Sequence, residues 1–169
     1  MEGSGTQPSG GAAAAAPKRN NMDYSLAALK VFGCQLAGAT YPASSEPESI
    51  PQAQMLYGIR FQRVWLQGVV VLTDYGVDGG IILVDDGSCV AEITLTPKET
   101  EGQPWREGMY VLVIGSYDGK ISLPRANRPL IKVHKLVDLS AQPDREAMWY
   151  MEVAEAYNFF YLQSSAANP

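Results

Sequence analysis

The chain has 169 residues, 46% of them apolar, and its formal net charge is −5 at pH 7. This length suits one domain with a hydrophobic core. No stretch approaches the roughly 18 consecutive apolar residues that a membrane-spanning helix needs, so no membrane partner is expected. Two cysteines and one histidine are too few for a metal centre of the usual kind, and we expect no metal and no cofactor.

The N-terminal part of the chain does not have the composition of a packed domain. Residues 1–24 are rich in Gly, Ala, Ser and Pro, which predicts a disordered low-complexity tail. Residues 25–57 start with an apolar arm, "SLAALKVFGCQLAGA", and continue as a loop rich in Pro and Ser. Periodicity does not decide whether the arm is a short helix or an extended segment. Residues 164–169 are predicted to be a disordered end.

Residues 58–140 have the pattern of a small β-barrel. Five short runs rich in β-branched residues are separated by turn signals such as "YGVDGG", "DDG" and "DGKISLPRANR". No helical pattern interrupts them in the way that a parallel βαβ sheet requires. The pattern predicts an all-β fold of the OB type, a five-stranded Greek-key barrel with a C-terminal α-helix.

Two glycines lie where strands of such a barrel have to bend. Gly68 interrupts the run "VWLQGVVVLTD" and Gly115 interrupts "VLVIGSY". Glycine weakens a strand interior, but it permits the sharp bend by which a long first strand pairs with two different neighbours. We therefore interpret Gly68 as a barrel corner, and Gly115 as a second one.

Residues 141–163 are predicted to form a C-terminal interface helix. Pro143 suits a first helical turn, and the dipole of the helix favours acids there. One apolar stripe at helical spacing consists of Trp149, Val153, Ala156 and Phe160, with Tyr157 adjoining it, while Glu152 and Glu155 mark the opposite side. The apolar face is broader than docking on one barrel requires, which indicates a second contact.

The sequence offers no catalytic constellation. His134 stands alone on a strand, and the glycine-rich segment "YGVDGG" does not have the spacing of a phosphate-binding loop. We therefore predict that the chain is not an enzyme. The barrel region has nine Lys and Arg against ten Asp and Glu, so it lacks the basic excess of a protein that neutralises phosphates. Weak or no nucleic-acid binding by the chain alone is expected.

Several segments together resemble the RecQ-mediated genome instability protein 2 family. They are the "LKV" arm, "VWLQGVVVLTDYG", "LVDDGS", "WREGMYVLVIGSY" and "PLIKVHKLVDLSAQPDREAMWYMEV". The most specific is "DLSAQPDREAMWYMEV", in which a Trp-containing helix start follows a strand that ends in DLS. The low-complexity tail, the insertion "TYPASSEPESIPQAQ" and the aromatic run "AYNFFYLQ" depart from the familiar pattern.

The resemblance implies a non-catalytic scaffold subunit. Such a subunit pairs with the C-terminal OB domain of RecQ-mediated genome instability protein 1, in the nuclear complex of a RecQ-family helicase with topoisomerase III alpha. That complex dissolves double Holliday junctions, limits crossovers and maintains genome stability. The residues that match family positions are Lys30, Trp65, Lys135, Met148 and Trp149.

We predict partner binding by these five residues and, from the helical stripe, by Val153, Tyr157 and Phe160. The alternative is a subunit that binds single-stranded DNA, similar to replication protein A, or a telomere-capping OB subunit. For that alternative, Trp65 would supply a stacking platform, and a modest basic patch would hold phosphates: Arg125, Arg128, Lys132 and Lys135.

Overall fold

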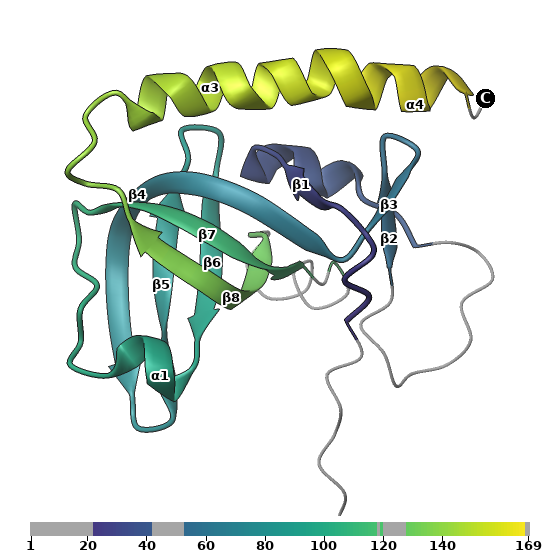
Figure 1. Ribbon diagram of the computed structural model, residues 1–169. Coiled ribbons are helices and arrows are strands. Elements are labelled where there is room, and N and C mark those ends of the chain that lie inside the picture. Colours follow the sequence, from purple (N-terminus) through teal and green to yellow (C-terminus); the bar gives the residue numbers. More distant parts are fainter. Residues whose placement is uncertain (1–21, 42–52, 118, 120–127, 168–169) are drawn as a thin grey trace, which may run out of the picture.

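The computed structural model describes residues 22–41, 53–117, 119 and 128–167. Most of the predicted tail and of the loop rich in Pro and Ser lies outside these residues. The described chain forms a barrel with one long helix across its end, as Figure 1 shows. No helix in the described part is long and apolar enough to cross a membrane.

Five strands close the barrel. They are β4 (Arg63–Gly76), β5 (Gly79–Asp85), β6 (Val90–Leu95), β7 (Tyr110–Tyr117) and β8 (Leu130–Asp138). The sheet runs β1-β4-β5-β6-β8-β7, and β4 also pairs with β7, which closes the ring. A short helix, α1 (Pro97–Thr100), lies between β6 and β7. The predicted OB-fold is confirmed.

The long strand β4 changes neighbours at its centre. Its first half pairs with β7 up to Val69, and its second half pairs with β5 from Val69 onward. A Cβ atom on Gly68 would stand 2.3 Å from the Asp85 carbonyl oxygen, so this close approach requires glycine. Gly115 likewise lies at a register shift between β7 and β8. Both glycines therefore occupy the bends that their positions in the sequence predict.

The segments that precede the barrel, of which the predicted apolar arm supplies the first two, pack on it in three pieces. Strand β1 (Ala28–Lys30) runs parallel to β4, and the 3₁₀ helix η1 (Gly33–Gly38) follows it. The hairpin of β2 (Gln54–Leu56) and β3 (Ile59–Phe61) leads into the barrel. The buried carboxylate of Asp86 joins η1 to the β5–β6 turn, because it accepts hydrogen bonds from the Gly33 and Cys89 backbone N–H groups.

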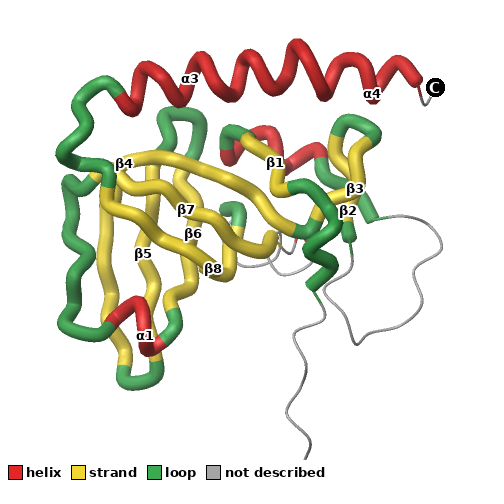
Figure 2. Tube along the Cα trace, in the orientation of Figure 1, coloured by secondary structure: helices red, strands yellow, loops and turns green. Residues whose placement is uncertain are grey.

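The C-terminal helix is continuous but not uniform. It consists of α3 (Arg145–Ala156), a π-helical turn η2 (Tyr157–Tyr161) and α4 (Leu162–Ala167), drawn as one red rod in Figure 2. It ends beyond residue 163, the predicted end of the interface helix.

The π turn changes which residues face the barrel. Because a π turn holds more residues than an α turn, the inward stripe moves on by one position within it. Tyr161 is buried instead of Phe160, which is 64% exposed. The predicted stripe therefore divides: Trp149, Val153 and Ala156 are buried against the barrel, whereas Phe160 is exposed, and its contact with a partner stays a prediction.

Candidate functional site

The inward side of the helix is part of the protein's own core. Trp149 and Val153 are each 1% exposed, and Ala156 and Tyr161 are also buried. The helix lies across the barrel end above β1 and the β2–β3 hairpin (Figure 1). Since a fully buried aromatic or aliphatic side chain contributes several kcal/mol, this side holds the helix in place.

Three tyrosines fasten the second half of the helix. The ring of Tyr57, at the turn of the β2–β3 hairpin, stacks on Tyr161 at 5.5 Å between centroids and meets Tyr157 edge-on at 5.3 Å. Tyr57 has a positive φ of 53°, which is uncommon for a residue other than glycine. The Tyr161 hydroxyl donates to the Lys30 carbonyl oxygen at 2.8 Å, and burial raises the pKa of Tyr161 to about 12. The π turn therefore lies where aromatic contacts fix it.

An ion pair joins the same helix to the arm. The Lys30 Nζ lies 2.7 Å from Glu152 Oε2, and the Arg145 guanidinium lies 3.2 Å from Glu152 Oε1. Burial alone would raise the pKa of Glu152, but the two cations hold it below its ordinary value of 4.5. The Lys30 ammonium also lies 5.5 Å from the centroid of the Trp65 ring. Arm, barrel and helix thus meet at this one cluster.

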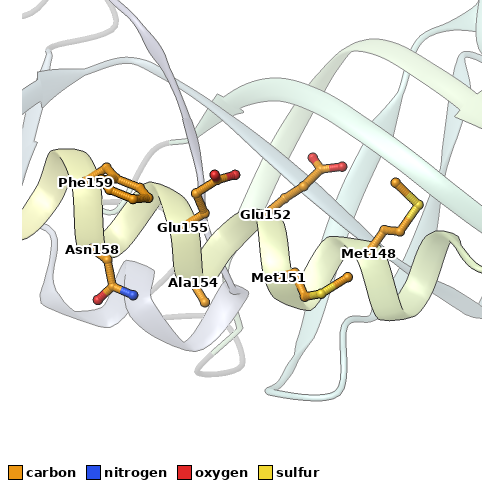
Figure 3. A pocket seen from close by; sticks show the side chains of 7 residues that line it. All are labelled: Met148, Met151, Glu152, Ala154, Glu155, Asn158 and Phe159. Carbon is orange, nitrogen blue, oxygen red and sulfur yellow. The ribbon is translucent and has the colours of Figure 1, made fainter.

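The outward side of the helix carries large apolar side chains that nothing in the described structure covers. Met148 is 43% exposed, Met151 64% and Phe159 59%. Together with Ala154 and Glu155 they line a shallow open groove, whose margin also includes Glu152 and Asn158. We call Met148, Met151, Ala154, Glu155 and Phe159 the outer helical face. Figure 3 shows them on consecutive turns of one helix. Contiguous exposed apolar groups of this size typically mark an interaction site.

Charge on the outer helical face is negative. Glu155 is exposed and forms no ion pair among the described residues, whereas Glu152 beside it is neutralised by Lys30 and Arg145. A long apolar groove with one free carboxylate suits an amphipathic helix that carries a matching cation. The face can therefore bind a protein segment.

The predicted partner-binding residues divide into three sets. Met148 and Phe160 are exposed, and Tyr157 is half-buried against Tyr57. Trp149 and Val153 are covered by the chain's own barrel, so we assign them to helix docking, and their direct contact with a partner stays a prediction.

The third set lies on the outside of the barrel. Lys30, Trp65, Ile114 and Lys135 form one row across β1, β4, β7 and β8, because each is the Cα partner of the next. Lys30 already binds Glu152 of the same chain, while Lys135 is exposed.

Sequence reasoning missed Met151 and Phe159. The interpretation of Glu152 and Glu155 as the mark of the polar side concealed the apolar residues that flank them, Met151 before the pair and Phe159 after it. The signal was present, since Met148, Met151, Glu155 and Phe159 follow each other at steps of three and four.

Other reactive groups do not form a site in the described part of the chain. No three His, Cys, Asp or Glu side chains come together there as a metal ion would require. Burial and neighbouring cations lower the pKa of His134, and burial raises the pKa of the Cys89 thiol to about 11. A neutral histidine and a protonated thiol without a partner base are typical of structural positions.

The similarities to known structures support the fold. The S. pombe Stn1–Ten1 complex gives a TM-score of 0.58 at 13% identity, over 69% of this chain and 85% of the matched chain. A replication protein A heterotrimer bound to single-stranded DNA also gives 0.58, at 18% identity, over 78% of this chain and 92% of the matched chain. At these identities the likeness concerns the fold alone.

The sequence itself identifies the family. A protein from Gallus gallus called RecQ-mediated genome instability protein 2 is 33% identical over 137 residues, which is 76% of this chain and 90% of the relative. The profile of the family of that name matches residues 27–157, from the arm to the middle of the C-terminal helix. The chain therefore belongs to the RecQ-mediated genome instability protein 2 family, whose name carries a role in genome stability.

Proposed function

We propose that the protein is a non-catalytic scaffold subunit that pairs with the C-terminal OB domain of RecQ-mediated genome instability protein 1. The pair would act in the nucleus, with a RecQ-family helicase and topoisomerase III alpha, in the dissolution of double Holliday junctions. One observation carries the proposal: the outer helical face is apolar and exposed, although the inward side of the same helix is already packed.

The chemistry of the face fits a helical partner. An amphipathic helix recognises such a surface through apolar anchors at steps of three and four residues. Methionine side chains adapt their shape to the partner, and aromatic side chains supply large contact areas. Glu155 would receive a lysine or arginine of the partner helix at the edge of the groove.

The aromatic end of the face is a feature of this chain rather than of the shared family segment. The family match ends at residue 157, and Phe159 and Phe160 follow it with exposed fractions of 59% and 64%. We infer that the partner helix of this protein is correspondingly long and contacts both phenylalanines.

The test is co-expression of the full chain with the C-terminal OB domain of the large partner. We expect a one-to-one complex in size exclusion with light scattering. Met151→Glu and Phe159→Glu should abolish it, because each places a charge inside an apolar contact. Val77→Glu is the matched control, since Val77 is fully exposed on the β4–β5 turn, away from the helix. If the two chains elute separately, the proposal is wrong.

The alternative function is binding of single-stranded DNA, which the likeness to replication protein A supports at the level of fold. Trp65 would be the stacking platform, but its ring lies beneath the Lys30 ammonium that Glu152 already binds. Titration of the full chain with labelled oligothymidylate decides the matter. Affinity that falls with salt and is lost in Trp65→Ala would favour this function.

A further inference from the structure

A second surface, which no described segment covers, lies on the side of the barrel, on strands β4, β5 and β6. Strand pairing places Leu72, Leu83 and Glu92 in one row, since each is the Cα partner of the next. Asp74 and Ile81 form the adjacent row by the same pairing. Cα partners in a sheet point to the same face. We call these five residues the lateral sheet face.

The lateral sheet face points away from the core. Along β5, Ile82 and Val84 are 0% exposed and fill the barrel, so Ile81 and Leu83 point outward by the alternation of a strand. Leu72 is 39% exposed, and Val71, the extra residue at the bulge beside it, is 42% exposed. Large aliphatic groups on two neighbouring strands thus face solvent, exposed on β4 and half-buried at Ile81 and Leu83 on β5.

Carboxylates stand among these aliphatic groups. Asp74 and Glu92 belong to the face, and Asp85 follows one step further along β5. None of the three forms an ion pair within the described residues, where the two ion pairs found both involve Glu152. Lys132, the partner of Thr94 on β8, adds one cation at the margin. The centre of the surface is therefore negative as well as apolar.

In the OB-fold, the outer face of the second and third barrel strands, here β5 and β6, is where oligonucleotides bind. Such binding needs cations for phosphates and aromatic rings for bases. The lateral sheet face carries carboxylates in place of the cations, and leucine and isoleucine in place of the aromatic rings.

We propose that this surface binds a protein segment that combines basic and apolar side chains. The apolar side chains of the segment would cover Leu72, Ile81 and Leu83, and its lysines or arginines would pair with Asp74 and Glu92. Negative charge at the surface gives such a segment both its orientation and its selectivity. The site is separate from the outer helical face and does not depend on the heterodimer proposed above.

The experiment titrates the full chain with three labelled synthetic peptides of about twelve residues. One contains leucines and lysines, the second has glutamate for each lysine, and the third has serine for each leucine. We expect the first to bind at least about tenfold more tightly than either of the others. Amide NMR shifts should locate it on β4, β5 and β6.

Charge reversal supplies the decisive comparison. Glu92→Lys should weaken binding of the leucine–lysine peptide about tenfold, whereas the same change at Glu155, on the outer helical face, should leave it unchanged. Asp74→Lys, at an exposed position, repeats the test if Glu92→Lys lowers the melting temperature. Equal affinity for all three peptides, or no effect of either reversal, overturns the proposal. Displacement of the peptide by oligothymidylate also overturns it, because a phosphate chain would then occupy the surface.

Discussion

The two sides of the C-terminal helix use similar residues for opposite purposes. Trp149 and Val153 on the inward side are each 1% exposed, while Met151 and Phe159 on the outward side are 64% and 59% exposed. Apolar content alone therefore does not distinguish docking to the chain's own barrel from docking to a partner. The distinction lies in which residues the barrel and the arm already cover.

The two sides also differ in how polar groups are treated. The cluster of Lys30, Glu152 and Arg145 on the arm side is paired within the chain, and the Tyr161 hydroxyl is bonded to a backbone carbonyl. Glu155 on the outward side has no ion pair among the described residues. Pairing on the inward side is not complete, since the buried Trp149 Nε1 and Arg145 Nε atoms have no hydrogen-bond partner among the described residues. The difference between the two sides is that the inward charges are neutralised within the chain, which contributes stability, whereas Glu155 is left for a partner to neutralise.

The largest expected effect is the loss of the inward anchor. Trp149→Ala removes a fully buried indole and should lower the free energy of unfolding by about 3–5 kcal/mol. Denaturant unfolding followed by circular dichroism measures it. Met151→Ala, a truncation on the outward side, should change the free energy by no more than about 0.5 kcal/mol. Equal losses in the two variants would show that the two sides do not differ as described.

Among variants that fold, partner affinity should depend on the outward side of the helix rather than on the inward side. Phe159→Ala should weaken binding of the partner domain by about 1–2 kcal/mol, because a large aromatic contact is lost at the interface. Its melting temperature should stay that of the unmutated chain. Isothermal titration calorimetry measures the affinity, with Val77→Ala as the control at a fully exposed position. Unchanged affinity in Phe159→Ala would remove the aromatic end from the interface.

The tyrosine contacts at the π turn give a smaller effect. Tyr161→Phe removes the hydrogen bond to the Lys30 carbonyl and keeps the ring, so it should cost about 1 kcal/mol of unfolding free energy. Tyr157→Phe is the matched control, because only the ring of Tyr157 takes part in the contacts with Tyr57 and Tyr161. Equal costs in the two variants would assign the effect to solvation of the hydroxyls.

Much of the fold could be predicted from the sequence because it follows from local rules. Strands with turn signals between them predicted the barrel, and Gly68 and Gly115 predicted its bends. Both kinds of signal depend on residues close in the sequence. The parallel pairing of β1 with β4 could not be predicted, since it joins Lys30 to Trp65 across the loop between them.

The candidate site was harder to predict because a small local change in the helix alters which residues are buried and which are exposed. A helical period of 3.6 placed Phe160 on one stripe with Trp149, but the π turn at Tyr157–Tyr161 buries Tyr161 on the same side as Trp149 and leaves Phe160 exposed. That turn is favoured by stacking on Tyr57, a residue about a hundred positions earlier. Glu152 gave the impression of a polar side, yet it is the partner of Lys30. Contacts with residues distant in the sequence therefore determine both the exposure of Phe160 and the pairing of Glu152.

The smallest expected effect is the pH-dependent stability that the Lys30–Glu152 ion pair contributes to the folded chain. The pKa of Glu152 is held below its ordinary value of 4.5 in the folded protein, so folding favours the ionised carboxylate. The resulting stability is present above that ordinary value and is lost as the pH falls through the lowered one. Because both side chains are partly exposed, the contribution should be at most about 1 kcal/mol.

The measurement is the difference in unfolding free energy between the unmutated chain and Glu152→Gln, since other carboxylates titrate equally in both. The difference should favour the unmutated chain at neutral pH and vanish once Glu152 is protonated in the folded state. Glu155→Gln should show no such pH dependence, because Glu155 has no ion pair in the described structure. A difference that grows on acidification would contradict the pairing. Added salt should shrink the difference at neutral pH, because the pair is open to solvent, whereas salt would leave the cost of Trp149→Ala intact.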